Sequence, residues 1–337
     1  INVPADQLSV LVAVILADSG DTIVVSAGDY SGEPASVWSN KNLTFIGAGP
    51  GLTTLPRLHA TSSDVRVENA SLPCIERAFE AAGIGSNTTL QGVEASGCAL
   101  SDPLIHVGGN LTVSNSTFVD METEVFGVIL AASGNHSIDG VDFSNVASLP
   151  EPVCDPMVSP CAVGAAASLF SSNANIINST FDGCVADVGA CVYFAGGAFS
   201  FPTFGELYIS DSTFTNSAGQ DSVLYAEDFT DFSMGDAEIS GNVSPGGVVV
   251  ADSRWDNDGI VAFGGLRMEN NQVTGSDAAA LVFKGVDFDV NVGETLFLRG
   301  SWFCGNENLV GPSDVLLEAI DNTVFDGAAF ALGLGTA

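Results

Sequence analysis

Short stretches of alternating apolar and polar residues recur along the chain, and turn-forming residues follow each of them. Examples are LTVSNSTF (111–118) and ELYISDSTF (206–214). Alternation with a period of two is typical of strands that bury one face. A second apolar run comes after the turn, as in VFGVILAA (125–132). The pattern therefore predicts an all-β chain of many short strands.

The tetrapeptide NSTF ends one such strand at 115–118 and another at 178–181, and DSTF stands at 211–214. Alignment on the apolar residue that closes each corner gives Val93, Phe118, Phe143, Phe181, Phe214, Ile239, Val273 and Phe303. The steps between these positions are 25, 25, 38, 33, 25, 34 and 30 residues, so the shortest repeat is 25. A unit of this length favours a parallel β-helix, in which each coil pairs with the next. We expect each corner Phe to point into the stack and the Ser and Thr to fill the turn.

The first twenty residues have a different period. Their apolar residues fall at i, i+3, i+4, i+7 and i+8, which is one face of a helix, and are Leu8, Leu11, Val12, Ile15 and Leu16. Gly20 stands where such a helix would stop. An open solenoid end exposes strand edges and core, so we predict that this stripe covers the first coil as a cap.

The segment LADSGDTIVVSAGDYSGEPASVWSNKNLTFIGAGPGLTTL (16–55) resembles the first coils of right-handed parallel β-helix proteins of the pectin-lyase-like superfamily. GGAF (196–199), FTNSA (214–218) and FCGN (303–306) are similar to the repeats of polymorphic outer-membrane-protein-like surface proteins. We therefore expect a right-handed parallel β-helix of roughly 25-residue coils. Its predicted organisation is a capping helix in 1–20, the β-helix in 21–337, and a Cys/Pro-rich insertion around 149–161.

Acidic residues dominate the charge of the chain. There are 41 Asp and Glu against 8 Lys and Arg, a net charge of −33. Nucleic acid and anionic membrane surfaces would repel such a protein, so neither is expected as a partner. The sequence also has no run of about 18 apolar residues, the length that would span a membrane.

Several features predict secretion to the cell exterior or cell surface. Asn-x-Ser/Thr sequons, the acceptors for N-linked glycans, occur at Asn42, Asn69, Asn87, Asn110, Asn115, Asn135, Asn178 and Asn242. The chain begins at Ile1 rather than Met, as expected of a mature end after removal of a signal peptide or of a fragment.

The seven cysteines favour disulfides over a metal site. None has the C-x₂-C spacing of a zinc site, and the three histidines are not clustered. Six cysteines are predicted to be paired, with the connectivity left open: Cys74, Cys98, Cys154, Cys161, Cys184 and Cys191. Cys304 is expected to be the unpaired seventh.

The resemblance implies enzymes that act on acidic polysaccharides, so the sequence was searched for their motifs. The arginines that could serve a lyase are Arg57, Arg66, Arg77, Arg254, Arg267 and Arg299. None has a recognisable lyase context, and the signatures of polygalacturonases and pectin methylesterases are absent. Eight basic residues spread along the chain would also make a poor cleft for an anionic polymer. No catalytic residue is predicted.

One stretch has the residue types of a cation site. In DSRWDNDG (252–259), Asp256 and Asp258 match the end of a calcium loop, and carboxylate oxygens suit this hard cation. Arg254 stands at the first position of that loop, where a carboxylate belongs, which favours a solvated acidic turn instead. Calcium at Asp256 and Asp258 is the one cofactor considered.

The sequence thus predicts a non-enzymatic extracellular structural glycoprotein whose subunits stack head to tail, through the solenoid ends, into a surface filament. Its expected partners are other copies of itself and N-linked glycans. The alternatives are a carbohydrate-active enzyme, either a pectin-lyase-like polysaccharide lyase or a hydrolase, and a glycan-binding adhesin.

Overall fold

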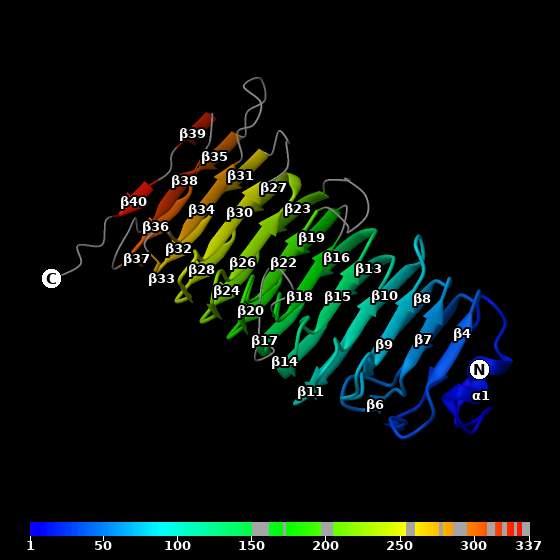
Figure 1. Ribbon diagram of the computed structural model, residues 1–337. Helices are drawn as coiled ribbons and strands as arrows, with labels where there is room; N and C mark the ends of the chain where they lie inside the picture. Colours follow the sequence, from blue (N-terminus) through cyan, green and yellow to red (C-terminus); the bar gives the residue numbers. More distant parts are fainter. Residues whose placement is uncertain are drawn as a thin grey trace.

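The computed structural model describes most of the chain as one elongated stack of coils (Figure 1). The described residues are 1–149, 162–170, 173–196, 205–253, 260–275, 279–285, 295–308, 314–318, 322–326 and 329–331. The N-terminal helix lies at one end of the stack, and the coils then follow one another in sequence order to residues 329–331 at the other end (Figure 1). The architecture is the predicted right-handed parallel β-helix.

Two sheets run the length of the stack, and every strand in them pairs in parallel with strands of the neighbouring coils. We call the larger one sheet A and the smaller one sheet B. The described strands of sheet B are β4 (Ser36–Ser39), β7 (Leu58–Thr61), β9 (Phe79–Ala82), β12 (Ile105–Val107), β15 (Ile129–Ala132), β18 (Ala167–Phe170), β22 (Val192–Ala195), β26 (Leu224–Glu227), β30 (Val249–Ser253), β34 (Leu281–Gly285) and β38 (Val315–Glu318).

Sheet A bends around the remaining sides of each coil. Its described strands are β1 (Asn2–Val3), β2 (Thr22–Val25), β3 (Gly28–Asp29), β5 (Leu43–Ile46), β6 (Thr53–Thr54), β8 (Val65–Ser71), β10 (Asn87–Ser96), β11 (Ala99–Leu100), β13 (Asn110–Ser114), β14 (Thr117–Thr123), β16 (Asn135–Asp139), β17 (Asp142–Ser148), β19 (Asn173–Ile177), β20 (Thr180–Asp182), β21 (Val185–Ala186), β23 (Gly205–Ser210), β24 (Thr213–Thr215), β25 (Ala218–Gly219), β27 (Phe229–Gly235), β28 (Glu238–Ser240), β29 (Val243–Ser244), β31 (Ile260–Gly264), β32 (Arg267–Glu269), β33 (Gln272–Val273), β35 (Thr295–Arg299), β36 (Trp302–Cys304), β37 (Glu307–Asn308), β39 (Asn322–Asp326) and β40 (Ala329–Ala331).

A column of aromatic rings fills the core behind the repeated corner. Phe118, Phe143, Phe181 and Phe214 are in register on successive coils and fully buried. Their ring centroids are 5.3, 5.1 and 4.7 Å apart, and each pair is stacked. Burial of one such side chain stabilises the fold by about 1.5–3 kcal/mol, and an aromatic pair adds roughly 0.5–1.5 kcal/mol. The predicted inward position of the corner Phe is confirmed.

The column differs from the sequence alignment at two positions. Ala95, not Val93, is in register with Phe118, and Met268, not Val273, follows Ile239. The predicted repeat was wrong there because only Phe, and not the aliphatic residues, marks the corner clearly in the sequence.

The corner itself explains the recurrence of N-S-T. Asn115, Asn178 and Asp211 have φ values of 47°, 50° and 49°, a left-handed conformation that Asn and Asp tolerate better than other side chains. The buried Ser116 hydroxyl donates to Ser114 O (2.8 Å) and accepts from Val93 N of the preceding coil (3.1 Å). The Ser therefore fills the turn as predicted. Thr117 does not, because it already begins β14 and faces outward.

The N-terminal cap is a short helix, α1 (Val10–Leu16), whose first turn is closed by Val12 N donating to Ser9 Oγ (3.2 Å). It lies against β2 and β4 at the first coil. The helix buries Val10, Ala13 and Val14. The predicted stripe is exposed instead, with Leu8 89%, Val12 38%, Ile15 62% and Leu16 58% accessible.

Polar contacts fix the rotation of α1 and overturn that prediction. Val10 N donates to Glu33 Oε2 (2.8 Å), and Lys41 Nζ donates to Val14 O (3.1 Å) and Ile15 O (3.2 Å). These bonds turn the face with the smaller side chains toward the core. Across the described residues, the longest helix is too short to cross a membrane. Residues 150–161 of the predicted insertion lie outside the described part of the chain.

Candidate functional site

A row of three polar side chains crosses the outer face of sheet B near the N-terminal end of the stack. His59 on β7, Glu80 on β9 and His106 on β12 are in register on consecutive coils. Their neighbours along each strand are buried, so period-two alternation directs these three side chains outward. Adjacent strands lie about 4.8 Å apart, so Glu80 is a near neighbour of His59, 21 positions before it, and of His106, 26 positions after it.

Two arginines complete this arrangement from the turns that precede β7 and β9. Arg57 Nη2 lies 3.3 Å from Glu80 Oε2, and Arg77 Nη1 lies 3.5 Å from Glu80 Oε1. His59 Nδ1 is 3.5 Å from Oε2, and His106 Nδ1 is 3.9 Å from Oε1. One carboxylate thus faces four nitrogen-bearing side chains.

A second carboxylate lies at the edge of the group, where Arg77 Nε is 3.3 Å from Asp102 Oδ2. We call these six residues the Glu80 cluster: Arg57, His59, Arg77, Glu80, Asp102 and His106. Two guanidinium groups balance two carboxylates, so the cluster is close to neutral in a chain of net charge −33. It would become cationic if its imidazoles were protonated. This outer face therefore differs in charge from the rest of the surface.

The protonation of His106 follows from its surroundings. Burial lowers the pKa of His106, the positive charge of Arg77 lowers it further, and the carboxylates of Glu80 and Asp102 oppose both effects. A lowered pKa leaves the imidazole neutral at neutral pH. A neutral imidazole can accept a proton, which is the state that a general base requires.

The cluster also contains donors that the protein leaves unused. Arg57 Nε, Arg77 Nε and His106 Nδ1 are buried and have no hydrogen-bond partner among the described residues. Buried polar atoms are paired in the great majority of native structures. The guanidinium side chains remain partly accessible, 36% for Arg57 and 38% for Arg77, so they can meet an anionic ligand, and carboxylates pair with guanidinium groups in a planar, two-bond arrangement.

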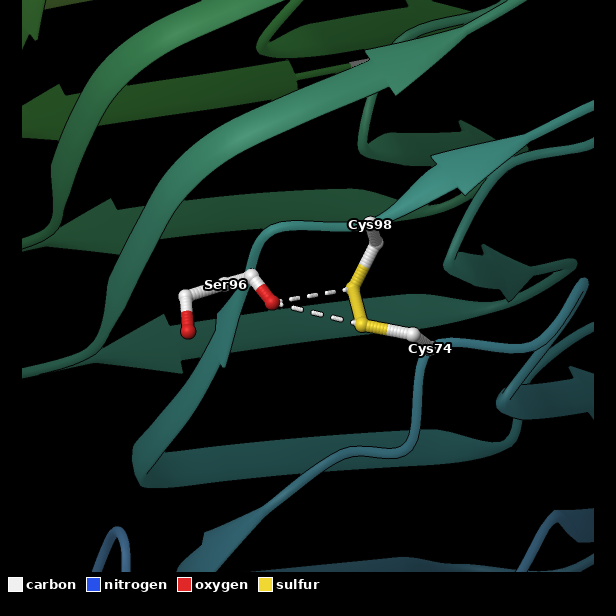
Figure 2. The surroundings of a disulfide bond; sticks show 3 residues. All are labelled: Cys74, Ser96 and Cys98. Carbon is white, nitrogen blue, oxygen red and sulfur yellow. Dashed lines mark hydrogen bonds between the residues drawn. A yellow bond between two sulfur atoms is a disulfide. The ribbon is translucent and has the colours of Figure 1, made fainter.

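The loops that carry Arg77 and Asp102 are tied to each other. A disulfide joins Cys74 in the turn after β8 to Cys98 at the end of β10 (Figure 2). The Ser96 carbonyl oxygen lies against it, 3.3 Å from Cys74 Sγ (Figure 2). Arg77, three residues after Cys74, donates its backbone N–H to Pro103 O (2.9 Å). Cys74 and Cys98 were both predicted to be in disulfides, and they are bonded to each other. The bond links the segments that lead to Arg77 and Asp102 of the Glu80 cluster.

Sequence reasoning missed this cluster. The basic residues were expected to be spread along the chain, whereas the fold gathers two arginines and two histidines on three coils. The available signal was the recurrence of RLH (57–59) and RAFE (77–80) before two apolar runs one coil apart. The hydrophobic pattern shows that these side chains face outward, but it does not align the outward faces of different coils.

The prediction that Cys184 and Cys191 form disulfides is wrong. Cys184 and Cys191 are free and fully buried, and Cys191 Sγ donates to Ser217 Oγ (3.2 Å). Burial and the neighbouring Cys184 raise the pKa of Cys191, so its thiol stays protonated in the core. Cys304 is free as well.

Several remaining calls fall beyond the described residues. Cys154 and Cys161 lie outside the part of the chain that the structure describes, as do Asp256 and Asp258 of the predicted calcium site. Among the described residues, no group of His, Cys, Asp and Glu is suited to hold a metal ion.

The asparagines of the eight sequons differ in how far they are buried. Asn242 is fully buried, and its amide donates to Phe214 O (2.9 Å) and Asn271 Oδ1 (3.0 Å) within a ladder that continues to Asn306. A glycan cannot be attached there in the fold, so this predicted site is wrong. The other seven asparagines are exposed or half-buried: Asn42, Asn69, Asn87, Asn110, Asn115, Asn135 and Asn178. Their glycosylation stays a prediction.

Comparison with known proteins gives matches at the level of structure. No protein-family model matches the sequence, and no curated protein matches it. Among solved structures, the chain is similar to a PL6 alginate lyase in complex with a trisaccharide, at 10% identity and a TM-score of 0.40, over 94% of this chain and 84% of that one. It is also similar to the catalytic domain of a GH87 alpha-1,3-glucanase in complex with tetrasaccharides, at 12% identity and a TM-score of 0.39, over 91% of this chain and 64% of that one.

A third match is a mannuronic-acid-specific polysaccharide family 6 lyase from human gut microbiota, at 9% identity and a TM-score of 0.33, over 94% of this chain and 78% of that one. The predicted parallel β-helix is seen in the strand pairing of this chain itself. The similarity to polymorphic outer-membrane-protein-like repeats stays a prediction.

The prediction of a non-enzymatic structural glycoprotein that forms filaments is corrected: the three structures named above are described as two polysaccharide lyases and a glucanase, and none as a filament protein. The prediction that the chain is not an enzyme is corrected with it. At such low identity the likeness concerns the fold alone. The chemistry of this protein has to be derived from its own side chains.

Proposed function

We propose that this protein is a carbohydrate-active enzyme that cleaves a uronate-containing polysaccharide by β-elimination at the Glu80 cluster. The observation that supports the proposal is the cluster itself, with two guanidinium groups and a neutral imidazole beside unpaired buried nitrogens. A uronate unit supplies the matching group, a carboxylate, next to the carbon whose proton must be removed.

The proposed reaction consumes no water and no cofactor. A base removes the proton at C5 of the uronate, the electron pair of that C–H bond forms the C4=C5 double bond, and the C4–O bond breaks. The departing sugar oxygen takes up a proton, which completes the balance. Negative charge develops on the uronate carboxylate in the transition state, and fixed cations at that position lower the barrier.

Within this proposal the residues have distinct roles. Arg57 and Arg77, whose side chains are 36% and 38% exposed, bind the substrate carboxylate and stabilise its developing charge. His106, neutral at neutral pH, accepts the C5 proton. Glu80 is a positioning residue, because it lies on the Nδ1 side of both imidazoles and leaves Nε2 toward the substrate.

We also propose that the enzyme works outside the cell. The disulfide at Cys74–Cys98 and the seven sequon asparagines at the surface support this location, since disulfides persist in oxidising compartments. N-linked glycans on those asparagines are part of the same proposal.

Incubation with alginate, polygalacturonate and a neutral glucan tests the function. We expect unsaturated uronate ends, measured by ultraviolet absorbance, on an acidic polymer and none on the glucan. Arg77→Ala should lower the rate at least 100-fold, whereas Arg66→Ala should leave it unchanged, because Arg66 is bonded to Glu68 and Gln91 on sheet A. Absence of unsaturated ends on every acidic polymer, or equal losses in both variants, would overturn the proposal.

A further inference from the structure

A cleft of about 520 Å³ lies on a different part of the surface, along sheet A of the first coils. Its floor is one register row, in which Asp29 on β3, Thr54 on β6, Ser71 on β8 and Glu94 on β10 follow one another on successive coils. Two hydroxyls thus stand between two carboxylates. With adjacent strands about 4.8 Å apart, the row extends over roughly 14 Å along the stack.

The floor is ordered but keeps acceptors free. Ser71 Oγ donates to Glu94 Oε1 (2.8 Å) and accepts from Gly51 N (2.9 Å), and Asp29 Oδ1 accepts from Ser31 N (2.9 Å). Glu94 Oε2 makes no hydrogen bond within the described residues. Hydrogen bonds from the side chain and then the backbone of Ser31 lower the pKa of Asp29, which keeps this carboxylate ionised. A free acceptor therefore remains at the Glu94 end of the row, and an ionised carboxylate stands at the Asp29 end.

One wall of the cleft is apolar. Leu72, Pro73 and Ile75 line it, and Ile75 is 38% exposed. The Cys74–Cys98 disulfide anchors this segment to the neighbouring coil. The cleft combines a polar floor with an apolar side, as small-molecule sites commonly do.

The charges of the lining select against two classes of ligand. Among the described residues, no Lys, Arg or His lines the cleft, so a uronate carboxylate would meet two carboxylates and no cation. A single metal ion is also disfavoured, because Thr54 and Ser71 separate Asp29 from Glu94 and no metal-binding group is found among the described residues. The carboxylates and hydroxyls of the floor suit a ligand rich in hydroxyl groups, which can donate to the former and exchange hydrogen bonds with the latter.

We propose that this cleft is a second carbohydrate site, which binds a short neutral oligosaccharide along the axis of the stack. Sugar hydroxyls donate to the carboxylates of Asp29 and Glu94, whose oxygens have lone pairs to spare, and the Thr54 hydroxyl can donate or accept between them. The C–H faces of the sugar rings cover Leu72, Pro73 and Ile75. The site stands apart from the Glu80 cluster, and its binding does not depend on the proposed elimination.

The decisive variants fill the cleft or remove one acceptor. Gly32 lines the cleft, has no positive φ and has open space around an added Cβ, so Gly32→Phe blocks the site without removing a polar group. Gly264 on β31 has equally open surroundings outside the cleft, which makes Gly264→Phe the matched control. Glu94→Ala removes the acceptor at one end, and thermal melting verifies that each variant is folded.

Isothermal titration calorimetry of the full chain with neutral gluco-, manno-, galacto- and xylotriose, and with trigalacturonate, tests the proposal. We expect at least one neutral trisaccharide to bind, Gly32→Phe and Glu94→Ala to weaken that binding at least tenfold, and Gly264→Phe and His106→Gln to leave it unchanged. The proposal is overturned if no neutral trisaccharide binds, if Gly32→Phe binds as the parent does, or if Gly32→Phe abolishes binding of trigalacturonate. Activity at the Glu80 cluster is measured separately, so the proposal for one site can be refuted while the proposal for the other stands.

Discussion

The three histidines of the chain show how strongly the surroundings of one residue decide its chemistry. His59 and His106 face Glu80 on the outside of sheet B, whereas His136 on β16 points into the core between Leu111 and Ala174. Among the described residues, neither ring nitrogen of His136 meets a partner at hydrogen-bonding geometry, and burial, opposed by the backbone of Asn135, lowers its pKa to about 4. Only the outward histidines are available for catalysis.

His136 should make the fold sensitive to acid. In the unfolded chain its pKa is about 6.5, so below that pH the unfolded state binds a proton that the folded state excludes until about pH 4. Stability is therefore complete above pH 6.5 and is lost as the pH falls toward 4, by about 2.5 kcal/mol at pH 4.5. Urea unfolding at pH 7 and 4.5 should show this extra loss in the parent but not in His136→Leu. An equal loss in both would rule out His136 as the cause.

His106 should set the acidic limb of the proposed activity. Because the pKa of His106 is lowered, the imidazole stays neutral to a pH below its ordinary 6.5, and the rate should fall only when it is protonated. A profile of kcat/KM against pH is expected to have its acidic limb below pH 6.5. His106→Gln should lower kcat by roughly 100-fold or more. If the acidic limb of the kcat/KM profile were unchanged in His106→Gln, the general base would be another residue.

The cysteines show which residue-scale features could be predicted. Disulfide formation was expected from their number, and the pairing was left open. Cys74 and Cys98 are 24 residues apart, one coil, and the stack brings them together. Cys184 and Cys191 are neighbours within one coil, and both are buried and free. The distance along the chain therefore does not reveal which cysteines form a bond.

Among the elements, α1 departs most clearly from the sequence pattern. The helix was predicted, but the stripe of large aliphatic residues was assigned to the core, and it is exposed. Hydrophobic periodicity predicts that a helix has an apolar face. It cannot weigh that face against backbone contacts such as those that Glu33 and Lys41 make with α1.

Substitutions on the two faces of α1 should separate these interpretations. Val14→Asp places a charge in a buried site and should destabilise the fold by about 3 kcal/mol or more. Ile15→Asp, on the exposed face, should change stability by less than about 0.5 kcal/mol. Chemical denaturation of both variants measures the difference. A larger loss of stability for Ile15→Asp than for Val14→Asp would mean that the helix buries the face predicted from the sequence.

The phenylalanine column should be the most sensitive element of the repeat. Phe181 is stacked on both sides, by Phe143 and Phe214, so Phe181→Ala should cost about 3–5 kcal/mol. Thr180→Ala, at the exposed neighbouring position, should stay within about 0.5 kcal/mol of the parent. Similar losses in both would mean that the stack does not depend on this column.

At the scale of the whole molecule, the fold could be predicted and the candidate site could not. A 25-residue period, strand-like alternation and turn residues at each corner are repeated along the chain, so each coil strengthens the same prediction. The Glu80 cluster arises only once. Its members come from three coils, and their alignment depends on the exact register of β7, β9 and β12.

The net charge of −33 has a consequence for the proposed substrate. Distant acidic residues repel a polyuronate at long range, whereas the arginines act at contact. Salt shortens the Debye length from about 30 Å at 0.01 M to about 8 Å at 0.15 M, which removes more repulsion than attraction. We expect kcat/KM on a polyuronate to rise over this range. A steady fall with salt would show that the basic cluster dominates the approach of substrate.

The central claim is that the Glu80 cluster breaks a uronate polymer by elimination rather than by addition of water. Mass spectrometry of the oligosaccharides released from alginate or polygalacturonate tests it most directly. The account predicts products lighter by one water than the corresponding hydrolysis products, formed by the parent and by Arg66→Ala but not by Arg77→Ala. Products of hydrolytic mass, or no released oligosaccharide from any uronate polymer, would contradict it.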